Sequence, residues 1–291
     1  MYLHITVRKK AVAILALLLA ACITYAFVHP ALRYKQAAAY NAPTVAVPII
    51  MYHGLLKDPD LQGQYVISPD LFESDIQYLV NNGYTTIVMQ DLINYVYNGG
   101  ELPEKPVMIT FDDGYYNNYL YAYPILQKYQ CKMVFSPIGR YADQYSQTPD
   151  THASFAHASW DMIKEMCDSG LVEVQNHSYN MHSNTNGRQG SKKNKNESLE
   201  DYKRIFTNDV NKAQQAITEN TGYTPTTFTY PFGAISDVSV DILKEQGFLA
   251  TLSCENKMNY LPRDPEALFG LKRFLRPGGL TSEQYFAKIL S

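Results

Sequence analysis

The stretch Val107-Met108-Ile109-Thr110-Phe111-Asp112-Asp113-Gly114 places two adjacent carboxylates and a glycine directly after a short apolar run. Such a run, bounded by turn residues, predicts a buried strand over 107–111. Neighbouring side chains of a strand point to opposite faces, so Asp112 and Asp113 can serve different roles, one as a metal ligand and one as a base. Alone, Asp-Asp-Gly is common in turns, so its meaning depends on the rest of the chain.

Similar apolar runs alternate with longer helical patterns. Strands are predicted at 45–52, 85–89, 107–111, 132–137, 172–176, 226–230, 248–253 and 271–275, and helices at 69–82, 117–129, 160–169, 198–220, 238–246 and 281–290. Ser68 and Ser159 are capping residues at two helix starts, and four glycines mark helix ends: Gly83, Gly170, Gly222 and Gly247. Six or more βα units predict an α/β fold whose parallel sheet closes into a barrel, with its chemistry at the carboxyl ends of the strands.

The first 43 residues are not expected to belong to this fold. Arg8, Lys9 and Lys10 precede an uncharged apolar run over 11–28, which as a helix would span roughly 27 Å. We therefore expect a membrane anchor in 1–28, a tether in 29–43 and one catalytic domain in 44–291, held outside the cytoplasm at the cell membrane. A cleaved signal peptide remains an alternative. So does a lipoprotein modified at Cys22, although the apolar run continues to Val28.

Charge and cysteine content exclude other classes. The whole chain has a net charge of −3, and without Arg8, Lys9 and Lys10 the charge is −6. Nucleic-acid binding requires a basic face and is not expected. The cysteines at 22, 131, 167 and 254 form no Cys-x-x-Cys pair, so neither a structural zinc site nor a disulfide framework is indicated.

A second cluster, His177-Ser178-Tyr179-Asn180-Met181-His182, follows the predicted fifth strand. Two imidazoles and one carboxylate form the open three-ligand site typical of hydrolytic zinc. Water bound to such an ion becomes a nucleophile near neutral pH. Because the strand ends of a barrel meet at one rim, the sequence predicts a metal site there.

The pairing of Thr-Phe-Asp-Asp-Gly at 110–114 with His-Ser-x-x-x-His at 177–182 resembles the polysaccharide deacetylase family of carbohydrate esterases. The resemblance covers Val47 to about Leu290. It implies a distorted (β/α) barrel, Asp112 as the general base, and a divalent metal, usually zinc, bound by Asp113, His177 and His182.

Further motifs narrow the resemblance. The two histidines lie five positions apart where the family commonly has four, and this form is similar to poly-N-acetylglucosamine deacetylases of exopolysaccharide systems. That subgroup also carries a Tyr-His near the first strand, which matches Tyr52-His53. Tyr230-Pro231-Phe232-Gly233 looks like the family's third motif, which implies that the Phe232 N–H holds the oxyanion. Pro231 and Tyr179 are expected at the substrate.

Two departures from the family pattern shape the prediction. Thr229 stands where an arginine usually braces the catalytic aspartate, and we assign that role to Arg273, with Lys272 and Arg276 as rivals. No histidine follows His182 to act as general acid, so His53 is predicted instead. His152 and His157 fall in a polar loop and are expected at the surface.

The expected activity is metal-dependent removal of N-acetyl groups from an extracellular amino-sugar polymer, an exopolysaccharide or peptidoglycan. Tyr116, Tyr179 and Trp160 are possible platforms for sugar rings, and residues 183–198 are predicted to form a mobile loop. A glycosidase is disfavoured because its two acids flank the scissile bond from separate elements. A catalytically impaired, sugar-binding descendant of the same fold remains open.

Overall fold

The computed structural model describes residues 44–185 and 187–290, so the predicted anchor and tether lie outside the described residues. Within this part of the chain, no helix is both long and apolar enough to cross a bilayer.

The centre of the domain is a parallel sheet. It contains β2 (Ile49–Tyr52), β5 (Thr85–Ile87), β6 (Pro106–Asp113), β7 (Met133–Pro137), β8 (Val172–Val174) and β12 (Phe274–Leu275). Every residue of β6 is buried. Such burial on both faces is typical of a parallel strand in a covered sheet, and Asp112 and Asp113 stand at the end of this fully buried strand.

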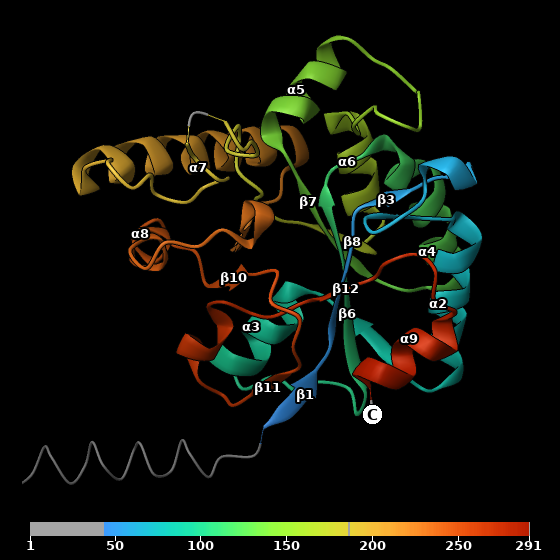
Figure 1. Ribbon diagram of the computed structural model, residues 1–291. Helices are drawn as coiled ribbons and strands as arrows, with labels where there is room; N and C mark the ends of the chain where they lie inside the picture. Colours follow the sequence, from blue (N-terminus) through green and yellow to red (C-terminus); the bar gives the residue numbers. More distant parts are fainter. Residues whose placement is uncertain (1–43, 186, 291) are drawn as a thin grey trace, which may run out of the picture. The chain divides into compact units, whose positions relative to one another are not determined.

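The sheet continues into a circuit. β9 (Thr227–Thr229) and β10 (Ala250–Leu252) form a parallel pair. An isolated bridge from Asn176 to Phe228 joins this pair to β8, and another from Leu252 to Leu271 leads towards β12, which pairs with β2. The order β2-β6-β7-β8-β9-β10-β12 therefore returns to β2 as a distorted barrel, with single bridges at two joins. Figure 1 shows β6, β7, β8 and β12 near the centre of the domain.

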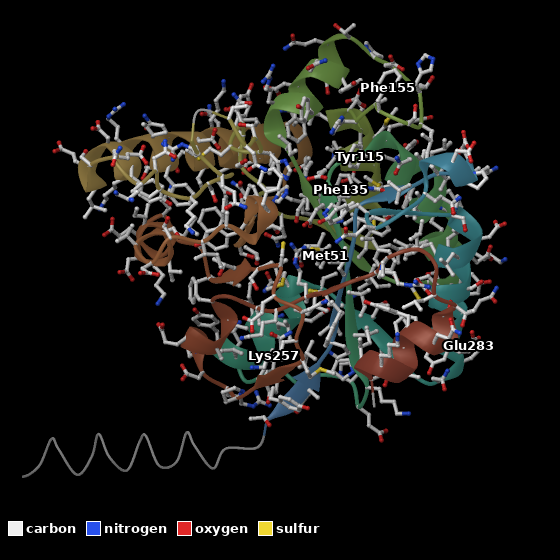
Figure 2. The ribbon with its side chains drawn as sticks, viewed as in Figure 1. Met51, Tyr115, Phe135, Phe155, Lys257 and Glu283 are labelled. Carbon is white, nitrogen blue, oxygen red and sulfur yellow. The ribbon has the colours of Figure 1, made fainter. Side chains whose placement is uncertain are left out.

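Helices cover the barrel in three groups. One apolar cluster packs α2 (Pro69–Asn81), α4 (Tyr123–Tyr129), α6 (Trp160–Asp168) and α9 (Ser282–Ile289) against the central strands. A second joins α3 (Met89–Tyr97) to β10 and β11 (Asn259–Leu261), and β11 pairs with β1 (Val45–Val47). A third holds α7 (Leu199–Thr221) and α8 (Ser239–Glu245) against β9. Figure 2 shows side chains filling the space between these layers.

The predicted α/β class and parallel sheet are confirmed, and most helix ends agree with the sequence. Ser68 and Ser159 accept hydrogen bonds at the starts of α2 and α6, and the four predicted stop glycines all have φ between 74° and 88°. Two helices were not predicted, α3 and α5 (Gly139–Gln147). The short pair β3 (Gly54–Leu55) and β4 (Val66–Ile67) was not predicted either.

Candidate active site

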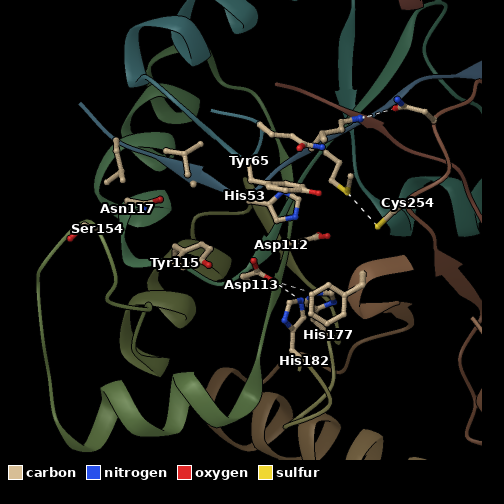
Figure 3. A pocket seen from close by; sticks show the side chains of 18 of the residues that line it. His53, Tyr65, Asp112, Asp113, Tyr115, Asn117, Ser154, His177, His182 and Cys254 are labelled. Atoms are coloured by element: carbon tan, nitrogen blue, oxygen red, sulfur yellow. Dashed lines mark hydrogen bonds and ion pairs between the residues drawn. The ribbon is translucent and has the colours of Figure 1, made fainter. Parts of the chain in front are cut away.

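Six of the predicted site residues come together at the carboxyl ends of the barrel strands. Asp112 and Asp113 end β6, His53 follows β2, and Phe232 follows β9. They line a pocket of about 690 Å³ together with His177 and His182 (Figure 3). Segments far apart in the sequence therefore present their polar side chains to one cavity, as the barrel topology requires.

Three side chains in this pocket could hold a metal ion. Nε2 of His177 lies 3.4 Å, and Nε2 of His182 lies 3.1 Å, from Oδ1 of Asp113. Ligand atoms of the three residues all lie within 4.8 Å of one another. Oδ1 of Asp113 and Nε2 of His177 are buried without a hydrogen-bond partner. Buried polar atoms are nearly always paired, so this convergence of free lone pairs fits a divalent cation and is poorly explained without one.

The tautomer of His177 suits a ligand. Its Nδ1 lies 2.7 Å from the carbonyl oxygen of Thr229. A carbonyl only accepts, so Nδ1 carries the proton and the lone pair of Nε2 faces Asp113. Metal-binding histidines characteristically donate their other N–H in this way. Thr229 stands where the family pattern usually has an arginine. In this protein its backbone carbonyl instead orients the imidazole of His177.

Electrostatics keep the carboxylate of this triad ionised. Burial alone would raise the pKa of Asp113, but the imidazoles of His177 and His182 outweigh burial when their Nε2 atoms carry protons, and they then hold that pKa well below its usual value. Burial would lower the pKa of His182, and the neighbouring Asp113 carboxylate raises it instead. The site therefore attracts positive charge, whether from a proton or from a metal ion.

Asp112 is fixed by Arg273, which lies just before β12. The guanidinium contacts both carboxylate oxygens, at 2.7 and 2.8 Å, and both side chains are almost completely buried. Arg273 also donates to the carbonyl of Ser253 at 2.7 Å, and this third contact fixes the plane of the guanidinium group. Burial would raise the pKa of Asp112, but the charge of Arg273 keeps that pKa below its usual value.

The two rival residues lie elsewhere. Arg276 forms a separate buried ion pair with Asp75, at 2.8 Å, and Asp75 also accepts from the hydroxyls of Tyr52 and Ser282. The side chain of Lys272 makes no hydrogen bond or ion pair among the described residues. Arg273 alone of the three contacts Asp112.

His53 lies in the pocket beside these acids. Its ring packs edge-on against Tyr65 at 5.0 Å, and its Nδ1 is buried without a partner. Burial lowers the pKa of His53, although the charges of Asp112 and Asp113 oppose that effect. This position is compatible with the predicted role of proton donor, which stays a prediction.

Strained backbone is concentrated at this rim. Asp113, Ser178 and Phe232 have φ of 70°, 68° and 57°, in the left-handed region that non-glycine residues seldom adopt. The fourth such residue in the described chain, Gln130, caps α4. Strain of this kind clusters at functional sites. Phe232 stands in the short Pro231–Gly233 turn after β9, and it is the residue of that turn that lines the pocket.

Not every predicted contact reaches the pocket. Tyr179, Pro231, Tyr116 and Trp160 are not among its lining residues. The Tyr179 hydroxyl donates to Asp143, as does the indole of Trp160. The aromatic lining comes from Tyr65, Tyr115 and Phe232, and Asn117 and Gln189 add polar groups. Tyr115 directly follows Gly114 and could have been found from the sequence, whereas Tyr65 lies in a loop with no pattern.

The prediction for His157 was wrong. His152 is exposed and paired with Asp150, as expected, but His157 is 91% buried. A backbone bridge to Tyr115 draws this loop onto the end of β6, and the imidazole packs 4.4 Å from the ring of Tyr141 and 4.8 Å from that of Tyr115. Burial lowers the pKa of His157 to about 4.

The segment after His182 is also attached to the rim. Ser191 is fully buried and its carbonyl accepts from Tyr202, while Lys193 donates from its backbone to Ser236. A Cβ on Gly190 would lie 2.8 Å from the carbonyl oxygen of Pro231, so only glycine permits this approach. The prediction of a mobile loop did not anticipate these contacts.

Known proteins are similar to this chain in sequence and in fold. The chain is 25% identical over 257 residues to a poly-β-1,6-N-acetyl-D-glucosamine N-deacetylase of Escherichia coli, a match that covers 80% of this chain and 38% of that protein. It is 28% identical over 194 residues to a Staphylococcus aureus protein of the same name, covering 66% of this chain and 62% of the relative. The chain thus spans well under two thirds of the E. coli relative's length.

A solved structure is similar to this chain in fold. A de-N-acetylase from Aggregatibacter actinomycetemcomitans superposes with a TM-score of 0.69 at 28% identity, covering 81% of this chain and 97% of that chain. Residues 99–251, more than half of the sequence, match the family described as polysaccharide deacetylase. They include Asp112, Asp113 and both histidines of the triad. The chain therefore belongs to the polysaccharide deacetylase family.

Proposed function

We propose that the protein is a metal-dependent hydrolase that removes N-acetyl groups from an extracellular amino-sugar polymer and releases acetate. The observation that carries this proposal is the position of Asp112, held by Arg273 directly beside the metal-binding triad. An ionised carboxylate next to a three-ligand metal site supplies the base and the activated water by which metal-assisted hydrolysis of an amide proceeds.

The residues of the site have separate roles in the proposed reaction. A bound divalent ion would polarise the acetamide carbonyl and lower the pKa of an attacking water. Asp112 would take the proton from that water, and the N–H of Phe232 would donate to the oxygen that gains negative charge. His53 would give a proton to the departing amine. Before this proton transfer, Arg273 keeps the Asp112 carboxylate ionised and oriented.

For the substrate we propose poly-N-acetylglucosamine, with peptidoglycan as the second possibility. Support comes from the E. coli and S. aureus relatives, which are named as poly-β-1,6-N-acetyl-D-glucosamine N-deacetylases. Further support comes from a pocket lined by Tyr65, Tyr115 and Phe232, whose rings suit contact with sugar faces. Deacetylation would convert a neutral polymer into a cationic one, which alters adhesion of the polymer to charged surfaces.

A catalytically impaired sugar-binding protein is the competing function. It would keep the pocket, but would have no need for the buried Arg273–Asp112 pair, which is costly to desolvate. The decisive experiment measures acetate release from each polymer, with and without a chelator and after zinc is restored. Release that depends on the metal supports the enzyme, and polymer binding without release supports the alternative.

We also propose that residues 1–28 anchor the domain to the membrane and 29–43 tether it outside the cytoplasm. Support comes only from the basic and apolar pattern of the sequence. The full chain should then sediment with membranes, resist salt and dissolve in detergent. A soluble chain that begins after Ala21 would show cleavage, and a lipid on Cys22 would show a lipoprotein.

A further inference from the structure

The two metal-ligand candidates His177 and His182 are the ends of one short loop, and the loop's shape decides whether they meet. Their rings lie 5.0 Å apart between centroids. The residues between them, 178–181, do not line the pocket. Their contacts therefore serve the loop itself, and those contacts show what holds the two ligands at this separation.

Part of the shape is internal. Ser178 has a left-handed φ of 68°, and its N–H donates to the side chain of Asn176 at 2.9 Å. Its hydroxyl then accepts from the N–H of Met181 at 3.1 Å. These contacts turn the chain immediately after His177 but leave the N–H groups of the two central residues, Tyr179 and Asn180, without internal partners.

Asp209, on helix α7, accepts both of these N–H groups. Its Oδ1 lies 2.8 Å from the nitrogen of Tyr179, and its Oδ2 lies 2.9 Å from the nitrogen of Asn180. One carboxylate thus binds two consecutive peptide groups. Hydrogen bonds to an ionised acceptor are about twice as strong as neutral ones, and a two-point contact fixes orientation as well as position.

Neighbouring contacts hold the same loop on α7 and α5. Lys212, one turn after Asp209, lies 3.8 Å from the centroid of the Tyr179 ring. On the opposite side, the carbonyls of Ser178 and Tyr179 accept from the backbone of Gly139 and Arg140 at the start of α5. The loop is therefore held between two helices (Figure 1). Within the described part of the chain, Asp209 supplies the one charged side chain that forms hydrogen bonds with its backbone.

We propose that Asp209 is a positioning residue for the metal centre, which holds the 177–182 loop in the shape that brings His182 to Asp113 and His177. The inference rests on the proposed function only in requiring that this triad binds a divalent ion. Asp209 does not line the pocket and is not in the metal-binding group, and the hydrogen bonds of its carboxylate among the described residues go to the backbone of Tyr179 and Asn180, so neither substrate contact nor direct ligation explains its contacts.

The test replaces the carboxylate by an amide. In Asp209→Asn the NH₂ group faces an N–H donor, so at most one of the two contacts can survive. We expect the zinc dissociation constant, measured by chelator competition, to rise roughly 10–100-fold, which is the usual effect of losing a group that orients a ligand. The visible absorption bands of the Co²⁺-substituted protein should shift, because the geometry at His182 changes.

Controls separate positioning from general stability. Glu219→Gln removes an exposed carboxylate from the same helix and should leave both the metal affinity and the Co²⁺ spectrum unchanged. Asp209→Glu retains the charge and should recover part of the affinity. If Asp209→Asn does not fold, Asp209→Glu takes its place in the same measurements, with an intermediate rise in the dissociation constant expected.

The outcomes are distinct. A folded Asp209 variant that binds zinc as tightly as the wild type, with an unchanged Co²⁺ spectrum, overturns the role of Asp209 and leaves the proposed function intact. A wild-type protein that binds no divalent ion contradicts the proposed function, and this inference with it.

Discussion

The guanidinium of Arg273 and the carboxylate of Asp112 form a two-point ion pair across 161 positions of sequence, at 2.7 and 2.8 Å. This contact orients the proposed base and suppresses its protonation. Lysine at position 273 would keep the positive charge but present a single point of contact. The pair therefore provides the most direct test of how the base is held.

Arg273→Lys should lower kcat roughly 10²-fold, the usual cost of a misplacement of about 1 Å at a reacting group. Zinc content should stay unchanged, because Arg273 contacts no residue of the triad. Steady-state kinetics with elemental analysis measure both. Lys272→Gln, one residue away, is the matched control and should behave as wild type. A normal kcat in Arg273→Lys would mean that catalysis does not need the two-point contact between the guanidinium and Asp112.

Asp112→Asn should retain the metal and lose roughly 10²–10⁴-fold in turnover, since the base is lost while the ligands remain. His177→Ala should lose the metal itself, because its Nε2 lies in the triad. Elemental analysis of the two purified variants distinguishes these effects. Loss of metal from Asp112→Asn would show that the roles of Asp112 and Asp113 are reversed.

His53 should govern the alkaline side of the pH–rate profile. A general acid works only when protonated, so the rate falls as pH rises through its pKa. Because burial lowers the pKa of His53, this decline in kcat/KM should begin below the ordinary imidazole value of about 6.5. His53→Gln should remove that limb and reduce turnover roughly 10²–10⁴-fold with metal content unchanged. A limb that persists in the variant would assign the proton to another group.

His157 should make the fold sensitive to acid. Its folded pKa is about 4, below the unfolded value of about 6.5, so the unfolded state binds more protons between these limits. Stability is therefore complete above about pH 6.5 and falls as the pH drops towards 4, by about 2 kcal/mol at pH 5 for this one group.

Replacing His157 by phenylalanine tests this directly, because the ring can still pack on Tyr141 but cannot be protonated. Urea unfolding at pH 7 and pH 5 should show a smaller loss in His157→Phe than in the wild type. His152→Phe, in the same loop but exposed, should lose as much as the wild type. Equal losses in all three proteins would mean that His157 is not neutral in the folded state.

The sequence predicted those features that local patterns encode. The strands that end at Asp112-Asp113 and before His177 could be predicted, because a short apolar run and the turn residues after it are local features of the sequence. Helix α3 could also have been predicted, since Met89, Leu92, Ile93 and Val96 follow helical spacing. Its first residue instead extended the predicted strand 85–89.

The remaining features depend on contacts between distant segments. The choice of Arg273 over Arg276 follows from barrel closure, which directs one arginine to Asp112 and the other to Asp75. The burial of His157 follows from a backbone bridge to Tyr115. No periodicity or propensity within either segment contains that information.

The left-handed residues have a consequence for engineering heat resistance. A non-glycine residue in that conformation costs about 1–2 kcal/mol, so glycine at Asp113, Ser178 or Phe232 would relieve strain while removing a ligand, a loop contact or a pocket wall. Gln130 carries the same strain at the end of α4, remote in function from the pocket. Among the left-handed non-glycine residues of the described chain, Gln130 is therefore the one at which glycine should raise thermal stability without lowering turnover.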